Sequence, residues 1–268
     1  MASGSLNEDL GLFGPDSVIW RVNRESAVAL AGTCAILMQL AHPKVAAGVR
    51  DHSRYQVDPV GRLRGTLDLT MAIVFGPRGA AMDAVRAINT RHRSIRGPGY
   101  DARHPELLLW VHATLVYSAI RGYRALVGPL STADADRYYQ DTKEIGVLLG
   151  IPREIYPARV DAFDAYLQRM IDGDELAVSA DARQMARAVL RPGFRGVPQL
   201  AYVPLTVLTA GLLPPSLRRA YELRWGRLER TAFAACRGIL PRLISLTPQP
   251  VRLLPPARDA YRRLSPAA

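Results

Sequence analysis

The sequence predicts an all-α protein built as one domain, and three observations support this prediction. Apolar residues recur at helical spacing along most of the 268 residues, and alternating β-branched runs are scarce. Proline and glycine fall between the periodic segments, where helices end. With 49% hydrophobic and 22% charged residues, the chain can bury a large core, whereas a disordered chain would carry fewer apolar side chains.

Eleven helices are expected from this periodicity. Their ranges are 24–41, 44–53, 59–75, 79–96, 104–127, 132–149, 158–172, 180–190, 197–213, 215–240 and 256–264. Ser131 or Thr132 supplies an N-cap for the helix over 132–149, and Asp134 and Asp136 suit the positive end of its dipole.

Helix-breaking residues separate several of these segments. Pro43 follows the first helix, and Gly and Pro at 76–77 divide the third helix from the fourth. The Gly-Pro-Gly run at 97–99 ends the fourth helix, and Gly and Pro at 128–129 end the fifth. Two prolines at 214–215 divide the ninth helix from the tenth. No internal repeat is visible, so we expect a single set of packed helices.

The net charge of +11 raises the question of an anionic partner. Lys44 and Lys143 are the only lysines, and the other 33 basic residues are arginines that occur in nearly every segment. Because no basic tail or dense basic block is present, we expect no nucleic-acid partner. Peripheral contact with an anionic membrane surface stays open.

The sequence favours a cytoplasmic protein. Its first residues, MASGSLNEDLG, are polar and acidic, unlike a secretory signal. The longest apolar runs, at 27–41 and 200–213, are shorter than the roughly 20 residues that cross a bilayer. Cys34 and Cys236 lie in apolar stretches and are expected to be buried free thiols.

Two polar residues share a helical stripe with apolar ones. Arg62, Thr66, Leu69 and Ile73 have the spacing 0, 4, 7 and 11. An arginine that faces a core needs an anion or several acceptors. The alternative is that Arg62 extends to the surface or pairs with a nearby aspartate.

Two histidines also lie on apolar stripes. His92 shares a stripe with Val85 and Ile88, and His112 shares one with Leu108. Burial keeps an imidazole neutral, and the neutral form is the one that binds iron or zinc. The alternative for each is a core histidine that hydrogen-bonds a backbone carbonyl.

Several common catalytic motifs do not occur. The sequence contains no GxSxG nucleophile elbow, no HExxH, no CxxC and no nucleotide-binding glycine loop. These absences argue against common hydrolase, zinc-protease, thiol-redox and nucleotide-binding classes. A helical core with inward polar groups fits a macrocycle or a metal ion better.

Three further segments occur in order: LMQLAHPKVAAGVRDHSRYQVDPVGRLRGTLDLTMAIVFG, NTRHRSIRG and HPELLLWVHATLVYSAIRGY. Together they resemble the MpaB-type oxygenase family, which includes the latex-clearing rubber oxygenases. The resemblance is best over residues 24–172. It implies an N-terminal extension over 1–23 and an oxygenase domain over 24–268.

The resemblance implies a non-covalently bound haem b inside an all-α fold with a globin-like core. It assigns His92 as the proximal ligand of the iron, and Arg62 and Thr66 as catalytic residues on the distal side. Arg96 or Arg91 is then expected to pair with a haem propionate. His112 is the alternative iron ligand, or a residue that lines the pocket or bonds a propionate.

Two departures from the rubber oxygenases bear on the reaction. Gly65 stands where those enzymes carry a lysine before the threonine, and the stretch KVAAGVRDHS offers no glutamate base. Asp51 and His52 are the nearest ionisable residues. The expected function is a haem-dependent oxygenase that uses dioxygen or peroxide on a small apolar organic substrate.

Two other functions stay open. One is a non-catalytic haem-binding or gas-binding protein on the same helices. The other is a haem-free helical protein that binds lipid or a membrane surface through LAYVPLTVLTAGLLPP and the arginine-rich LRRAYELRWGRLERTAFAAC.

Overall fold

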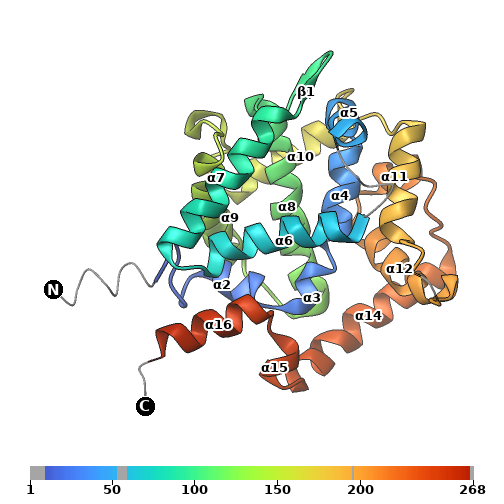
Figure 1. The fold of residues 1–268 in the computed structure, drawn as a ribbon. Coiled ribbons are helices and arrows are strands. Elements are labelled where there is room, and N and C mark those ends of the chain that lie inside the picture. Colours follow the sequence, from blue (N-terminus) through green and yellow to red (C-terminus); the bar gives the residue numbers. More distant parts are fainter. Residues whose placement is uncertain (1–9, 53–58, 195, 266–268) are drawn as a thin grey trace.

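The computed structural model describes residues 10–52, 59–194 and 196–265 and confirms an all-α single domain (Figure 1). The α-helices are α2 (Val18–Asn23), α3 (Ser26–Ala29), α4 (Gly32–Leu40), α5 (Pro43–His52), α6 (Pro59–Phe75), α7 (Arg78–Ser94), α8 (Pro105–Leu126), α9 (Thr132–Leu148), α10 (Val160–Asp172), α11 (Ala180–Leu190), α12 (Val203–Leu212), α13 (Pro215–Ala220), α14 (Arg227–Leu246), α15 (Gln249–Arg252) and α16 (Pro255–Leu264). Short 3-10 helices occur at η1 (Arg153–Ile155) and η2 (Gln199–Tyr202). Within these described ranges, the strands are limited to β1 (Arg96–Gly97) and β2 (Tyr100–Asp101), which pair antiparallel. The globin-like character of the core stays a prediction.

Helix α8 lies at the centre of the molecule (Figure 1). Pro105 occupies its first turn, where a missing amide hydrogen costs nothing, and Glu106 suits the positive end of its dipole. Its side chains are apolar on most sides, as expected for a buried helix, and Trp110 is fully buried. It packs against α4, α14, α3 and α9.

Helices α6 and α7 form an antiparallel hairpin joined at Gly76 and Pro77. They pack closely near this joint and then diverge (Figure 1). The start of the hairpin is tight, because a Cβ on Gly76 would lie 2.4 Å from the carbonyl oxygen of Ala72. The hairpin carries the predicted residues Arg62, Thr66 and His92.

The helix boundaries differ from the predicted ones in several places. Helices α2 and α15 were not predicted, and the expected helix over 197–213 begins as the 3-10 helix η2. Helix α14 extends to Leu246, beyond the predicted end at residue 240. The expected helix over 24–41 is broken at 30–31 into α3 and α4. The expected helix over 215–240 is split into α13 and α14 because Glu222 adopts a left-handed φ of 56° after α13. The helix predicted to reach residue 96 ends at Ser94, because Arg96 pairs with Asp101 in the β1–β2 hairpin.

The two cysteines are both free thiols, as predicted. Cys34 is fully buried, and burial raises the pKa of its thiol to about 12. Cys236 was also expected to be buried but is only half-buried, because it lies on the outer helix α14.

No single helix among the described residues has both the length and the apolar content that crossing a bilayer requires. The segments Ser26–Leu40 and Pro43–His52 meet them as a pair, with a bend of 108° between the two.

Candidate functional site

His92 lies on the inward face of α7, near the end of the helix. On the same stripe Val85 is buried and Ile88 is half-buried against the core. Asn89 lies three residues before His92 on α7. Its side-chain amide donates a hydrogen bond to the Leu148 carbonyl at the end of α9, at 3.0 Å. This contact fixes the rotation of α7, so the half-buried His92 ring is directed toward the interior.

One ring nitrogen of His92 has no protein partner. Its Nδ1 atom is buried and makes no hydrogen bond within the described part of the chain. Burial, and secondarily the charge of Arg91, lower the pKa of His92, so the ring is neutral near pH 7. Leaving a buried polar atom unpaired costs about 1–3 kcal/mol, so such an atom calls for a water or a ligand. A neutral imidazole in this state is suited to bind a metal.

A strip of α8 is left uncovered at Leu115. Its side chain is 41% exposed, although Thr114 beside it is fully buried. Thr114 accepts a hydrogen bond from Gln39 of α4 at 3.0 Å, and His112 on the other flank packs edge-to-face on Tyr156 with ring centroids 5.7 Å apart. Leu115 lies between these two flanks on the helix, so neither α4 nor the η1 side covers it.

This uncovered strip belongs to the central helix, where an exposed leucine is unexpected. Val111, one turn earlier, is only half-buried. Figure 1 shows α8 between α4 and α7, with α6 crossing in front of part of it. Exposed apolar surface in such a place is typical of a ligand-binding surface. We call Val111 and Leu115 the α8 strip.

The predicted site residues lie on four elements, which are α6, α7, β1 and α8. Thr66 is exposed on α6, and the side chain of Arg62, one turn earlier, lies outside the described residues. His92 lies on α7, the partner of α6 in the hairpin. Arg96 is exposed on β1, and its carbonyl oxygen lies 3.2 Å from Nε2 of His52. His112 faces the opposite flank of α8, toward Tyr156.

His112 belongs to a buried polar cluster that the sequence did not indicate. Burial lowers the pKa of His112 to about 4, and its Nε2 atom has no partner among the described residues. The buried hydroxyl of Tyr156 has none there either. Lys143 is 8% exposed and donates to the carbonyls of Pro157 and Ala158 at 3.3 and 3.2 Å. The one available signal was that Lys143 is one of only two lysines in the chain.

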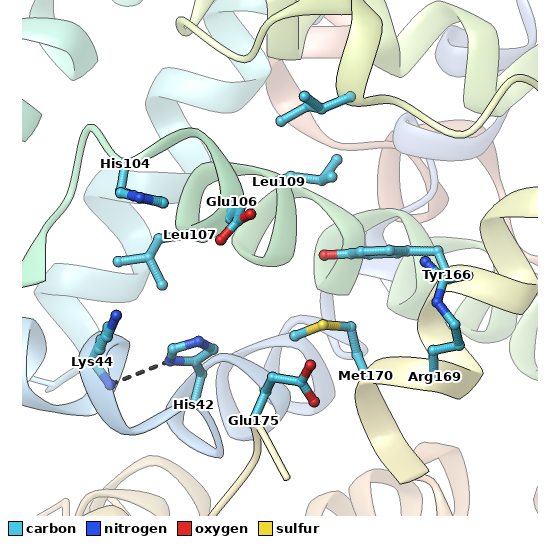
Figure 2. A pocket seen from close by; sticks show the side chains of 11 residues that line it. His42, Lys44, His104, Glu106, Leu107, Leu109, Tyr166, Arg169, Met170 and Glu175 are labelled. Atoms are coloured by element: carbon cyan, nitrogen blue, oxygen red, sulfur yellow. Dashed lines mark hydrogen bonds between the residues drawn. The ribbon is translucent and has the colours of Figure 1, made fainter. Parts of the chain in front are cut away.

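A surface pocket of about 350 Å³ lies at the start of α8 (Figure 2). It is lined by His42, Lys44, His104, Glu106, Leu107, Leu109, Ile155, Tyr166, Arg169, Met170 and Glu175. None of the predicted site residues lines it. Figure 2 shows charged groups of both signs around it, with Arg169 lying over the Tyr166 ring at 5.8 Å. Its polar rim does not fit the predicted apolar site.

Metal ligands are sparse in the described residues. No three histidine, cysteine, aspartate or glutamate side chains in those ranges come together as a metal site. The described residues therefore offer single histidines, such as His92 with its unpaired Nδ1 atom, and no ready-made cluster of ligands.

Comparison with known proteins gives this geometry a family. The family model described as "ER-bound oxygenase mpaB/B'/Rubber oxygenase, catalytic domain" matches residues 20–242. The chain belongs to this oxygenase family. The match includes α6, α7 and α8, and therefore the predicted site residues.

Two mycobacterial proteins are similar to this oxygenase-family chain. They are the "uncharacterized protein Mb2261" of Mycobacterium bovis and the "uncharacterized protein Rv2237" of Mycobacterium tuberculosis. Each is 32% identical over 209 residues, which cover 74% of this chain and 81% of the relative. No solved structure matches the chain significantly.

Proposed function

We propose that the protein is a haem-b-dependent oxygenase that uses dioxygen or peroxide to oxidise a small apolar organic substrate. The observation that carries the proposal is the buried, unpartnered Nδ1 atom of His92 in a chain of the MpaB and rubber oxygenase family. Haem supplies an iron centre that activates oxygen, and the surrounding protein decides what the oxygen does.

His92 is the residue proposed to hold the haem iron. Its ring is neutral because burial lowers its pKa, so a nitrogen lone pair is available. The α8 strip and the half-buried Ile88 and Leu69 supply apolar surface suited to a porphyrin face. A porphyrin that covered Leu115 would remove an exposed leucine from water, which is favourable.

Arg62 and Thr66 are proposed as catalytic residues that would contact the oxidant. A guanidinium donates several hydrogen bonds in a fixed plane, which suits an oxygen-bearing oxidant or a propionate. The Thr66 hydroxyl would give this side a polar group, and Gly65 leaves no side chain to block the iron. Arg91 and Arg96 are exposed near the end of α7 and are proposed to pair with propionates at the solvent edge.

His112 is proposed as a residue that would line the haem pocket and not as the iron ligand. Its ring packs on Tyr156, and burial holds its pKa at about 4. Reaching the hairpin would require it to leave this contact. His92 needs no such rearrangement, because its inward ring already lies on α7.

Haem retention tests the ligand assignment. We expect the purified protein to show a Soret band and His92→Ala to lose most of its haem. His104→Ala is the matched control, because this exposed histidine makes no side-chain capping bond. Retention of haem by His92→Ala, with loss in His112→Ala, would show that the assignment is wrong.

Product analysis separates an oxygenase from a gas-binding protein. The haem-loaded protein is incubated with a panel of terpenoid and aromatic compounds, and products are identified by mass spectrometry. We expect an oxygenated product whose formation falls in Thr66→Val while the Soret band persists. Reversible binding of carbon monoxide without any product would favour the non-catalytic alternative.

A further inference from the structure

Helix α14 carries an exposed apolar stripe along one side. Leu228, Ile239, Leu243 and Leu246 are 72%, 54%, 54% and 81% exposed. Their spacing of 0, 11, 15 and 18 residues places them within one narrow sector of an α-helix. We call these four residues the α14 stripe.

The α14 stripe is distinct from the face that attaches this helix to the protein. Phe233, Leu240 and Ile244 are half-buried and pack against the core. Through this face α14 contacts α8 and α12 (Figure 1). The helix therefore has two apolar faces, of which one is covered by the protein and the other meets solvent.

Neighbouring elements also expose apolar side chains. Val251 of α15, shortly after the end of α14, is 71% exposed. Leu200 of η2 is 80% exposed and Val203 at the start of α12 is 43% exposed. Helix α12 packs beside α14. Exposed apolar side chains gathered along one side of a helix, as in the α14 stripe, are typical of an interaction site.

Helix α14 itself is strongly positive. It carries four exposed arginines, Arg227, Arg230, Arg237 and Arg242. Within α14 the single acidic side chain, Glu229, is buried, accepts a hydrogen bond from the Gly226 amide at 2.7 Å and pairs with Arg224 at 2.9 Å. Arg242 lies beside the stripe and is exposed.

We propose that the α14 stripe docks this protein on the surface of an anionic lipid bilayer. The leucines and Ile239 would enter the interface between headgroups and acyl chains, and the arginines would meet lipid phosphates. Basic residues near such a surface would add electrostatic attraction to it. A second copy of the chain fits less well, because pairing two copies of this face would bring like charges together.

Vesicle sedimentation tests the proposal without any measurement of activity. The purified protein is mixed with phosphatidylcholine vesicles, with or without phosphatidylglycerol, and the bound fraction is measured. We expect binding that requires phosphatidylglycerol and weakens in high salt, because exposed charges are screened. Leu243→Glu/Leu246→Glu should reduce the partition coefficient about tenfold or more, since it replaces buried apolar contact by repelled charge.

A control variant keeps this test specific. Leu10→Glu/Ile155→Glu places the same two charges on residues that are 36% and 38% exposed, outside the stripe, and should leave binding unchanged. The proposal is overturned if phosphatidylglycerol vesicles do not bind the protein, or if both variants bind equally well. It is also overturned if the protein is a dimer that Leu243→Glu/Leu246→Glu converts to a monomer and that does not bind vesicles.

Discussion

His92 and His112 illustrate how one residue type takes two roles through its surroundings. Both rings are neutral, because burial lowers both pKa values, and each has a buried nitrogen without a partner in the described chain. His112 is held by Tyr156 in the interior, whereas His92 lies half-buried on the diverging hairpin. Access, and not basicity, is what distinguishes the proposed ligand.

The buried His112 makes stability depend on pH. Its pKa falls from 6.5 in the unfolded chain to about 4 in the folded one, so the unfolded state binds more protons between these values. The contribution of the neutral His112 ring to stability is therefore fully present above pH 6.5. It is lost as the pH falls toward 4, by an amount on the order of 3 kcal/mol. Urea unfolding at a series of pH values measures this loss.

The matched variants for this measurement are His112→Gln and His104→Gln. We expect the first to reduce the dependence between pH 6.5 and 4, because one titrating group is gone while His42 and His92, whose pKa values burial also lowers, remain. The second changes an exposed histidine and should retain the slope of the parent protein. An unchanged slope in His112→Gln would contradict the assignment of this dependence to His112.

At the scale of elements, a buried ion pair joins the two ends of the chain. Glu25, before α3, is 1% exposed and accepts two hydrogen bonds from Arg252 of α15, at 2.7 and 2.8 Å. The backbone adds a bond from the Leu254 amide to the Arg24 carbonyl at 2.8 Å. These contacts hold α15 against α3, so the C-terminal helices return to the start of the domain.

Removing one partner of this pair should destabilise the fold. We expect Arg252→Met to lower the free energy of unfolding by about 3–5 kcal/mol, because it leaves the Glu25 carboxylate buried without its main partner. Arg153→Met, which breaks an exposed pair with Glu144, should cost at most about 1 kcal/mol. Denaturant unfolding compares the two variants, and equal losses would contradict the prediction.

At the scale of the whole molecule, α16 closes the domain beneath α6 and α2. Tyr261 packs edge-to-face on Trp20 with centroids 5.3 Å apart, and Arg263 donates to the Phe75 carbonyl at 2.7 Å. The small residues Ala257 and Ala260 are fully buried. This helix lies beyond residue 242, where the family match ends, yet it covers part of the core.

A matched pair of substitutions tests this closure. Ala260→Gln should lower the free energy of unfolding by about 2–4 kcal/mol, because a larger polar side chain has no room in a fully buried position. Arg262→Gln changes an arginine that is 79% exposed and should alter stability by less than about 1 kcal/mol. Thermal unfolding measures both, and a mild effect of Ala260→Gln would show that α16 is dispensable.

Local sequence patterns predict the helical class, most helix ranges and the apolar stripe that contains His92. Local rules suffice for these features, because the apolar period, the prolines and the glycines act within a few residues of where they stand. They also predicted the turn between α6 and α7 at Gly76 and Pro77, where the structure places it.

Tertiary packing sets which of these faces stay uncovered. The exposure of Leu115 depends on α4 and η1, which lie far from it in the sequence, and the α14 stripe is open because no described helix packs on it. The burial of Lys143 likewise depends on the carbonyls of Pro157 and Ala158. Such outcomes depend on contacts between distant segments, which a helical period cannot encode.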